Sequence, residues 1–362
     1  MAQAVFRLRA HFYRAHAKRA AAGQVQPPRS VSWRRELGKV ADLDAALTMP
    51  LVRLQPDIIH ANDVYALSVA VNAKAILARR SHPVKLVYDA HEYVAGYPRW
   101  TRRLEVAYQK LERALAPKFD AVVTVSEPIA DAMWRELRLP RRPVVVHNSP
   151  DPSRVRPASG GTVRQAAGLP PGAPLVVYSG VIQAQRNVAG VIKALPLLEG
   201  VHFAIVCVPS TKVPLAQELI PLAQEAGVAD RVHLLEPVDP PEIASYLAGA
   251  DLGVDPMDTD FGQHAYCLPN KLWDYLQAGL PVAVSNNQLE RQLVEADGLG
   301  AVFDPSSAQS IAAAIRQVLD QAAAYRAKVA ASSLVQQYAW PGQVARLVAL
   351  YQELSGRREA SR

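Results

Sequence analysis

The segment from Leu268 to Ser285 contains the residues whose types and spacing most directly suggest chemistry. Pro269 suits the first turn of a helix, and Asn270, Lys271 and Asp274 follow at spacings that place them on one helix face. Amides at a helix start bind phosphate, and the Asp274 carboxylate can accept hydrogen bonds from a ribose diol. An ordinary amphipathic helix with a Lys–Asp pair gives the same pattern, so this segment alone leaves both interpretations open.

A second candidate site follows an apolar run that ends in Tyr178-Ser179-Gly180. A glycine at a strand end allows a ligand to approach the backbone closely. Arg186 follows a few residues later, and its planar guanidinium can hold a diphosphate. A βα turn that carries a surface arginine is the alternative.

Polar residues also follow two apolar runs in the first half of the chain. His60, Asn62 and Asp63 come after one run, and His91 and Glu92 come after the next. Ligands bind beyond the carboxyl ends of the strands in parallel α/β sheets, so these side chains are candidates for a second binding surface. Helix-capping and turn residues would explain the same groups.

The elements that must position these residues alternate in type, because short apolar strands are separated by helical segments of ten or more residues. This alternation predicts parallel sheets covered by helices on both faces. The first half has expected strands at 58–59, 84–88, 121–125 and 144–146, and helices near 40–54, 64–80, 100–116 and 127–137. The second half has expected strands at 175–178, 203–208, 232–235, 252–254 and 281–284, and helices that include 240–248 and 269–278. A last helix pair is expected from about 307 onward, broken near Trp340 and Pro341.

The domain organisation follows from this alternation and from shifts in composition. A stretch rich in Pro, Gly, Ser and Arg separates the two halves, and 362 residues are enough for two domains. We therefore expect a basic N-terminal arm, a first α/β domain, a linker, a second α/β domain and a C-terminal helix, at residues 1–39, 40–150, 151–173, 174–335 and 336–362.

The composition limits the class of protein. Half of the residues are hydrophobic and 20% are charged, which is typical of a globular protein with a large core. No run of eighteen apolar residues predicts a membrane span, and the basic N-terminus lacks the apolar stretch of a secretory signal. The two cysteines, Cys207 and Cys267, form no CxxC pair, so neither a disulfide framework nor a zinc site is indicated. We expect a cytoplasmic protein with reduced thiols.

The positive charge is concentrated in residues 1–39. This arm contains nine of the 40 Lys and Arg residues and one of the 33 Asp and Glu residues, which gives it a charge of +8. The other 31 basic and 32 acidic residues nearly cancel. Such an arm favours an anionic partner such as a membrane surface or nucleic acid, or it is a solvated arm with no partner.

Taken together, these segments resemble the retaining glycosyltransferases of family 4, which have the two-domain GT-B fold. The resemblance covers about residues 54 to 355. The stretch from Pro269 to Pro281 is similar to a family branch with a Pro-Asn-Lys-Leu-aromatic-acid-Tyr run before Ala-Gly-Leu-Pro-Val. Ser126-Glu127 and Asn148 are also typical of the family. Trp340 and the terminal helix that ends near Tyr351 resemble the family's helix that crosses back onto the first domain, so the helix in 336–362 is expected to return to the N-terminal domain.

The resemblance implies roles for individual residues. The donor side comprises Gly180, Arg186, Asn270, Lys271 and Asp274, with Arg186 on the diphosphate and Asp274 on the ribose. His91 occupies the position of the family's histidine beside the donor sugar and the acceptor, which makes it the catalytic candidate. The acceptor side comprises His60, Asn62, Asp63 and Glu92.

Four features depart from the family pattern. Tyr266 stands where the main pattern has its first glutamate, and Asp274 replaces the second. Val181 follows Gly180 where many members have a basic residue. Only about 57 residues precede the position of His60, so the first domain is expected to lack the usual first strand and glycine-rich acceptor loop.

The implied fold is two doubly wound Rossmann-like domains that face each other across a cleft, with the N-terminal one truncated. The implied activity is metal-independent transfer of a sugar from a UDP- or GDP-sugar to a glycan or lipid-linked glycan, with retention of configuration, in polysaccharide biosynthesis. No cofactor, metal or nucleic acid is expected, and the arm 1–39 is expected to attach the protein peripherally to an anionic membrane, at the inner face of the plasma membrane. The alternatives are a nucleotide-sugar-binding protein without turnover and a nucleotide-sugar epimerase on the same fold.

Overall fold

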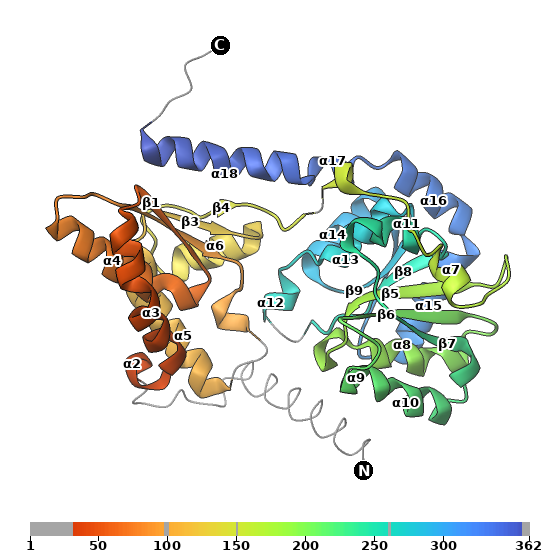
Figure 1. Cartoon of the computed structure of the whole chain (residues 1–362). Helices are drawn as coiled ribbons and strands as arrows, with labels where there is room; N and C mark the ends of the chain where they lie inside the picture. Colours follow the sequence, from red (N-terminus) through yellow and green to blue (C-terminus); the bar gives the residue numbers. More distant parts are fainter. Residues whose placement is uncertain (1–31, 98–100, 150, 260–261, 357–362) are drawn as a thin grey trace. The chain divides into compact units, whose positions relative to one another are not determined.

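The computed structural model describes residues 32–97, 101–149, 151–259 and 262–356. The described chain forms two compact units (Figure 1). The N-terminal unit combines residues up to 147 with two later segments, 262–266 and 341–356. The C-terminal unit takes the described residues of 148–260 and 267–340. Most of the expected basic arm, residues 1–31, lies outside the described residues, which begin at residue 32.

The N-terminal unit is built on a four-stranded parallel sheet. Its strands are β1 (Ile58–Asn62), β2 (Lys85–Ala90), β3 (Ala121–Thr124) and β4 (Val144–Val145), and they lie in the order β1-β2-β3-β4. All three pairings are parallel, so the carboxyl ends of the strands meet at one edge. The polar segments that follow β1 and β2 are therefore neighbours, as the register between Asn62 and Asp89 shows.

Helices cover both faces of this sheet. One face packs against the larger core, to which α3 (Gly38–Leu54), α4 (Leu67–Arg79), α5 (Arg102–Leu115) and α6 (Glu127–Glu136) contribute. On the other face Leu350 of α18 (Trp340–Ser355) closes over Val87, Ala121 and Val123. Because both faces of the sheet are covered, the residues in the middle of these strands are buried and mostly apolar, and the polar residues lie toward the strand ends.

Caps define where the helices of this unit begin. The side chain of Thr101 accepts from the backbone N of Leu104 at the start of α5, and Ser126 accepts from Ile129 at the start of α6. Such caps satisfy amides that have no partner within the helix. The short helix α2 (Trp33–Glu36) is tied to α5 by a two-pronged ion pair between Glu36 and Arg103.

The C-terminal unit has a six-stranded parallel sheet. Its strands are β5 (Leu175–Val181), β6 (His202–Val208), β7 (Val232–Leu235), β8 (Leu252–Asp255), β9 (Val282–Ser285) and β10 (Gly300–Phe303). Their order is β10-β9-β8-β5-β6-β7, so the direction of winding reverses between β5 and β8. The expectation of two Rossmann-like α/β domains with parallel sheets is confirmed.

Two apolar layers enclose this sheet. One contains α8 (Val188–Ala194), α10 (Leu219–Glu225) and α15 (Ala308–Asp320), and the other contains α7 (Val163–Ala166), α11 (Ile243–Leu247) and α13 (Asn270–Gln277). Trp273 of α13 is fully buried and stacks on Tyr338, with 4.8 Å between the ring centroids. Helix α13 is therefore fixed on the apolar side, which leaves its opposite side to the residues of the candidate site.

The expected C-terminal helix pair is wrong in its number, because the described residues after β10 form four helices: α15, α16 (Ala322–Ala331), α17 (Leu334–Gln337) and α18. The expected break near Trp340 is confirmed, since α17 ends at Gln337 and α18 begins at Trp340. Pro341 lies in the first turn of α18 and does not end a helix. This placement is favourable because the first turn has no intrahelical partner for the missing N–H of proline.

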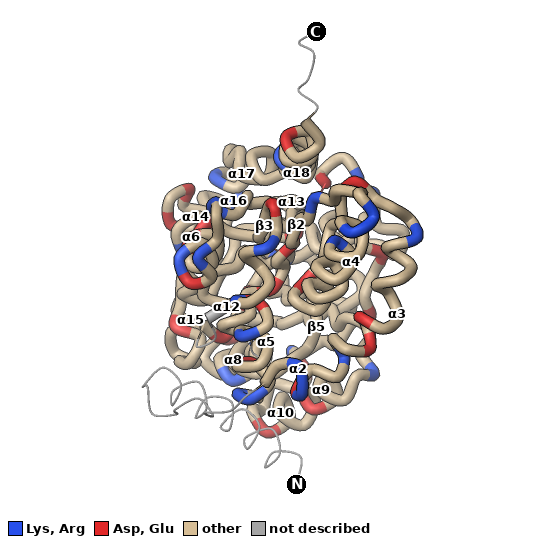
Figure 2. Tube along the Cα trace, turned by 90° about the vertical axis from the view of Figure 1, so that its left-hand side faces the viewer, with Lys and Arg blue, Asp and Glu red and all other residues tan. Residues whose placement is uncertain are grey.

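Part of the stretch expected to be a linker packs into the C-terminal unit. Val163 is fully buried, and the Arg164 guanidinium donates to the carbonyl oxygens of Gly249 and Ala173 and pairs with Asp251. Figure 2 shows acidic and basic residues interspersed along the described chain, in agreement with the charge balance beyond the arm. No helix of the described residues is both long and apolar enough to cross a membrane.

Candidate functional site

The strand order of the C-terminal unit reverses between β5 and β8, so the carboxyl ends of these two strands form a topological switch point. Ligands of open α/β sheets bind at such a switch point, beyond the carboxyl ends of the strands. Here β5 and β8 pair only at their beginnings, through Val176 and Val177. Further along, the Tyr275 hydroxyl lies between them, accepting from the Ser179 amide at 3.1 Å and donating to the Val254 carbonyl at 3.1 Å. Tyr275 thus holds the two strands apart at the end where Gly180 and Asp255 lie.

Gly180 and Lys271 meet at this switch point. Gly180 has a φ of +142°, which side chains rarely adopt, and a β-carbon there would lie 3.7 Å from Lys271 Cε. The Lys271 ammonium lies 5.4 Å from the centroid of the Tyr178 ring, within the range of a cation–π contact. The structure therefore brings together two residues that are 91 positions apart and that the sequence analysis had placed on one site.

Lys271 belongs to a buried charge cluster that the sequence analysis did not identify. Its Nζ atom lies 3.2 Å from Oδ1 of Asp255, and the side chains are 7% and 0% exposed. Glu290 is also fully buried, and its carboxyl group interacts with that of Asp255. No N–H or hydroxyl group of the described residues donates to either carboxyl oxygen of Glu290 or to Oδ2 of Asp255. Burial raises the pKa of Glu290 well above its ordinary value, and Asp255 raises it further. A proton on Glu290 that is donated to Asp255 gives the two buried carboxyl groups a hydrogen bond to each other.

Arg186 lies at the edge of this cluster, in the 3₁₀ turn η5 (Ala184–Arg186). The hydrogen bond that the structure gives its guanidinium runs from Nη1 to the sulfur of Met257, at 2.9 Å. A thioether is a weak acceptor, so most of the donor capacity of this half-buried side chain is available for a ligand. The positive charge of Arg186 also contributes to the lowered pKa of Lys271, which is due first to burial, whereas Asp255 acts in the opposite direction.

Asp274 and Asn270 lie on the same short helix as Lys271. Asn270 is exposed at the first position of α13. Burial raises the pKa of Asp274 to about 6, although the Lys271 charge opposes this shift. A carboxylate that has lost hydration without gaining a strong partner is suited to accept hydrogen bonds from a ligand. Of the predicted donor residues, Gly180, Arg186 and Lys271 line the switch point, and Asp274 and Asn270 share the helix of Lys271.

The N-terminal unit has a second cluster, centred on Asp89 at the end of β2. His60 Nε2 lies 3.1 Å from Asp89 Oδ2, and His91 Nδ1 lies 3.7 Å from Asp89 Oδ1. Tyr351 of α18 hydrogen-bonds through its hydroxyl to the other ring nitrogen of His60. Burial acts to raise the pKa of Asp89, but the hydrogen bond from His60 and the nearby His91 ring outweigh it and lower the pKa to about 2. The Asp89 carboxylate, at ion-pair distance, raises the pKa of His91 above its ordinary value, against the effect of burial.

The remaining residues predicted on this side surround the cluster. Asp63 has a φ of +58°, an unusual conformation for a residue other than glycine, and its amide donates to the Asp89 carbonyl at 2.8 Å. Burial raises the pKa of Asp63, whereas the charge of His91 lowers it. Glu92 accepts from the side chain of Gln263, which belongs to α12 (Gly262–Ala265), and Asn62 is exposed at the end of β1.

Sequence reasoning noted Asp89 among the polar residues at this strand end without giving it a role, and it did not place Tyr351 in the second cluster. Asp89 directly follows the apolar run of β2, so its position at a strand end is a signal that the sequence carries. Tyr351 is separated from His60 by 291 positions, and only the packing of α18 on the sheet brings them together. Tyr266, which stands in place of the family's first glutamate, packs partly buried against the core of the N-terminal unit.

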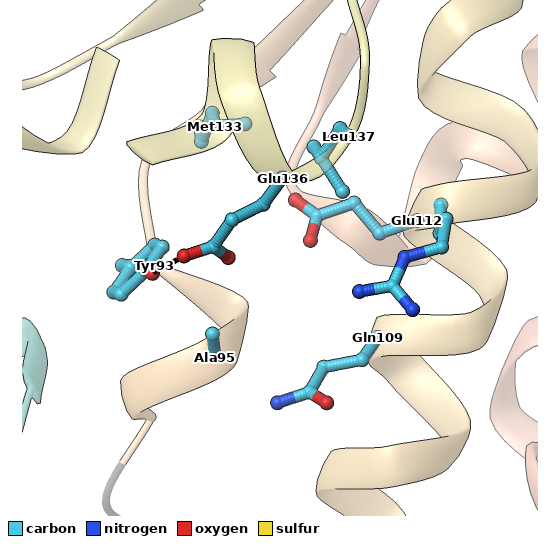
Figure 3. Close-up of a pocket in the computed structure, with 8 residues that line it drawn as sticks. Tyr93, Ala95, Gln109, Glu112, Met133, Glu136 and Leu137 are labelled. Carbon is cyan, nitrogen blue, oxygen red and sulfur yellow. Dashed lines mark hydrogen bonds between the residues drawn. The ribbon is translucent and has the colours of Figure 1, made fainter. Parts of the chain in front are cut away.

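A cavity of about 120 Å³ lies elsewhere in the N-terminal unit, between the 3₁₀ turn η2 (Val94–Gly96), α5 and α6 (Figure 3). Tyr93 donates to Glu136 on one side of it, at 3.1 Å. Glu112 lines the cavity and accepts from the Tyr88 hydroxyl at 2.8 Å. Burial raises the pKa of Glu112 to about 7, so this carboxyl group is mostly protonated in mildly acidic solution.

Two family models match the chain, one in each half. "Glycosyltransferase Family 4" matches residues 5–154, and "Glycosyl transferases group 1" matches residues 161–332. Together they cover most of the sequence. The first contains His60, Asp89 and His91 of the second cluster, and the second contains the switch point between β5 and β8. Among the described residues no group of three or more His, Cys, Asp and Glu side chains is placed to hold a metal ion.

Curated relatives are similar over part of their length. The chain is 31% identical over 214 residues to a D-inositol 3-phosphate glycosyltransferase of Mycolicibacterium smegmatis, in an alignment of 57% of this chain and 46% of the relative. It is 29% identical over 226 residues to the protein of that name from Thermobispora bispora, over 59% of this chain and 51% of the relative. The chain thus spans about half the length of these relatives.

Solved structures share the fold at low sequence identity. Sucrose-phosphate synthase from Thermosynechococcus elongatus superimposes with a TM-score of 0.69 at 17% identity, over 92% of this chain and 82% of the other. The Anabaena protein HepE in complex with UDP-glucose superimposes with a TM-score of 0.67 at 20% identity, over 88% and 84%. These likenesses establish the architecture, whereas the site residues rest on the geometry described above.

Proposed function

Because the chain belongs to the family 4 glycosyltransferases of the GT-B fold, we propose that it transfers a sugar from a nucleotide diphosphate sugar to an acceptor hydroxyl. The observation that carries this proposal is the cluster at the switch point, where Arg186 has unused donors beside the buried Lys271–Asp255 pair. Two cations next to a glycine without a side chain form a pocket for a diphosphate. HepE, which shares the fold, has been solved with UDP-glucose, and this similarity supports a donor of the same class.

The donor would be held by three kinds of contact. Arg186 and the first turn of α13 stabilise the diphosphate, and they continue to do so as charge develops on the leaving group. Asp274 accepts from the ribose hydroxyls in its ionised form. The protein's own cations provide this stabilisation, so the proposal requires no metal ion or cofactor. Retention of configuration belongs to the proposal through the family.

The second cluster would provide the acceptor side. His91 is half-exposed and is held next to Asp89, so its free ring nitrogen is available to a ligand. We assign it to the reacting sugar, with His60, Asn62, Asp63 and Glu92 around the acceptor. The acceptor is proposed to be a glycan or lipid-linked glycan. The relatives named D-inositol 3-phosphate glycosyltransferases make a cyclic polyol phosphate a second acceptor to test.

The arm 1–39 would bring the enzyme to its acceptor. Its charge of +8 attracts anionic lipids by about 1 kcal/mol for each basic residue near the surface. We expect the protein to sediment with anionic vesicles at low salt and to be released at high salt. Deletion of residues 1–31 should abolish sedimentation and leave both units folded. Binding that ignores salt would exclude an electrostatic arm.

A panel of UDP- and GDP-sugars tests the activity. A donor at a hundred times its dissociation constant stabilises the protein by about 2.7 kcal/mol, which a thermal shift detects. Radiolabelled donor is then followed with glycan, lipid-linked glycan and inositol phosphate acceptors. Labelled acceptor, or slow hydrolysis without one, supports the transferase. Binding with neither product indicates a nucleotide-sugar-binding protein, and an isomerised donor indicates an epimerase.

A further inference from the structure

Four side chains of the N-terminal unit contact one another in series, and two of them, Asp89 and Tyr351, have no role in the proposed function. The series runs from Tyr351 to His60, then to Asp89, and ends at His91. Three of the four come from β1, β2 and the residue after β2, and the fourth comes from α18. His60 and Asp89 are about one-fifth exposed, whereas His91 is 54% exposed. The series therefore has a shielded middle and one accessible end.

The donors and acceptors in this series have a single consistent direction. Neutral histidine has one N–H and one acceptor nitrogen. His60 Nε2 faces a carboxylate and therefore carries a hydrogen, so in the neutral ring Nδ1 accepts from the Tyr351 hydroxyl. The carboxylate of Asp89 accepts from His60 through Oδ2, which leaves Oδ1 for the ring N–H of His91, 3.7 Å away.

We propose that Asp89 is a positioning residue for His91, held in place by His60 and by the Tyr351 hydroxyl of the C-terminal helix. Asp89 fixes His91 as the form with a hydrogen on Nδ1, so that Nε2 is the nitrogen presented to a ligand. The carboxylate cannot rotate away, since its other oxygen is bound to His60. This inference rests on the proposed function only where it concerns turnover, because the tautomer of His91 exists with or without catalysis.

The charged groups around His91 support the assignment to Asp89. Asp89, Asp63 and Glu92 all favour its protonated form, and burial opposes them. Of these carboxylates, Asp89 lies within ion-pair distance and has the largest effect on the pKa of His91. Asp63 retains a raised pKa of its own, and Glu92 accepts from Gln263. Asp63 accepts from the backbone amide of His91, whereas Asp89 is the carboxylate at ion-pair distance from the His91 ring.

The test reads the His91 ring directly by ¹⁵N nuclear magnetic resonance, with His91→Gln to assign its signals. In the wild-type chain we expect Nδ1 to carry the hydrogen of the neutral form. Asp89→Asn should bring the pKa of His91 below its wild-type value and mix the two tautomers. Tyr351→Phe keeps the ring of α18 and removes one hydroxyl, so it should move the His60 signals strongly and those of His91 in the same direction by less.

Two control variants separate this effect from general damage to the sheet. Asp120→Asn loses ion pairs with Lys74 and Lys85 on the same sheet but has no contact with His91. Tyr325→Phe loses a hydroxyl that accepts from Gln317 in the C-terminal unit. Neither should alter the titration or tautomer of His91. A His91 titration that is the same in Asp89→Asn as in the wild type would overturn the proposal. If Asp89→Asn fails to fold, unchanged His91 signals in Tyr351→Phe would overturn it instead.

Turnover separates this inference from the proposed function. If His91 acts at the reacting sugar, Asp89→Asn should lower kcat by about 100-fold and change the KM for the donor by less than about threefold. If His91→Gln retains wild-type kcat, the proposed role of His91 fails, whereas the positioning by Asp89 still stands or falls on the spectra. A large loss of kcat in Asp89→Asn with unchanged His91 spectra would contradict the positioning role alone.

Discussion

Gly253 lies directly against the ring of Tyr275: a β-carbon at Gly253 would stand 2.3 Å from Cγ of that ring. Tyr275 is fully buried, and its hydroxyl bridges β5 and β8 at the switch point. Gly253→Ala should therefore displace the ring and destabilise the fold by about 1–3 kcal/mol or more, as overpacked cores do. Affinity for the donor should fall as well. Urea denaturation and donor titration measure the two effects.

Gly342→Ala is the matched control for this substitution. A β-carbon at Gly342, inside α18, meets nothing within 4 Å. Replacing a helical glycine by alanine stabilises a helix by about 0.5–1 kcal/mol. If both alanine variants are equally tolerated, the contact between Gly253 and Tyr275 does not shape the switch point.

The buried carboxyl groups of the C-terminal unit should respond differently to amide substitution. Asp255→Asn removes the counter-charge of buried Lys271 and should cost about 3–5 kcal/mol in the free energy of unfolding. Glu290→Gln should cost less than about 1 kcal/mol, because the amide donates to Asp255 as the protonated acid does. Denaturation of both variants at pH 7 makes the comparison. The reverse order of costs would mean that Asp255, and not Glu290, holds the proton.

Donor affinity should depend on the ionisation of Asp274. Its pKa is about 6, so the carboxylate that accepts from ribose is present above pH 6 and is lost as the pH falls below it. We expect affinity for the nucleotide sugar to fall about tenfold from pH 7 to pH 5 by calorimetry. Asp274→Asn should bind weakly and lose this pH dependence, whereas pyrophosphate should bind equally to both proteins. A parallel loss for pyrophosphate would place Asp274 at the phosphates.

Arg186→Ala should weaken nucleotide-sugar binding by about 1.5–3 kcal/mol, the range for a hydrogen bond to a charged group. The effect should be similar for pyrophosphate, since the guanidinium faces the diphosphate. Arg291→Ala is the matched control, because Arg291 is exposed and pairs within its own helix with Glu295. Equal affinities for wild type and Arg186→Ala, with the fold intact, would remove Arg186 from the donor site.

Glu112 should make the N-terminal unit less stable above about pH 7 than in acidic solution. Its pKa is raised from 4.5 to about 7, so the folded state keeps a proton that the unfolded state releases near pH 4.5. Stability is therefore lost as the pH rises from 4.5 to 7, by up to about 3 kcal/mol. Glu112→Gln cannot titrate, so relative to wild type it should be more stable at pH 8 than at pH 5. Glu295→Gln, an exposed control, should show no such difference, and an identical pH profile for Glu112→Gln and wild type would refute the buried acid.

The sequence predicted the parallel sheets, and it grouped Gly180 with Lys271, which the structure brings together, because both inferences depend on local patterns. Strands such as β6 are continuous apolar runs, and Asn270, Lys271 and Asp274 lie within one helical turn or two of each other. Gly180 and Arg186 were recognised because they follow a strand. Local spacing is enough in these cases, since the topology of an α/β sheet brings strand ends together.

The sequence could not predict partners that are distant along the chain. Asp255 ends its strand as an isolated acid, and nothing in its neighbourhood indicates that Lys271 and Glu290 will share its burial. Tyr351 reads as one apolar position of a helix until α18 is packed on the N-terminal sheet. By contrast, the break near Trp340 and Pro341 was predicted correctly, because proline favours the first turn of a helix and so indicates where α18 begins.

The packing of α18 also determines the order in which the two units can be completed during synthesis. The N-terminal unit is translated first, yet the face that contains Val87, Ala121 and Val123 is covered by Leu350. That apolar face remains without its cover while the ribosome makes the entire C-terminal unit, whose described residues end at 340. The unit encoded second is therefore finished before the unit encoded first, and the nascent chain must carry an unprotected sheet for about 200 residues of elongation.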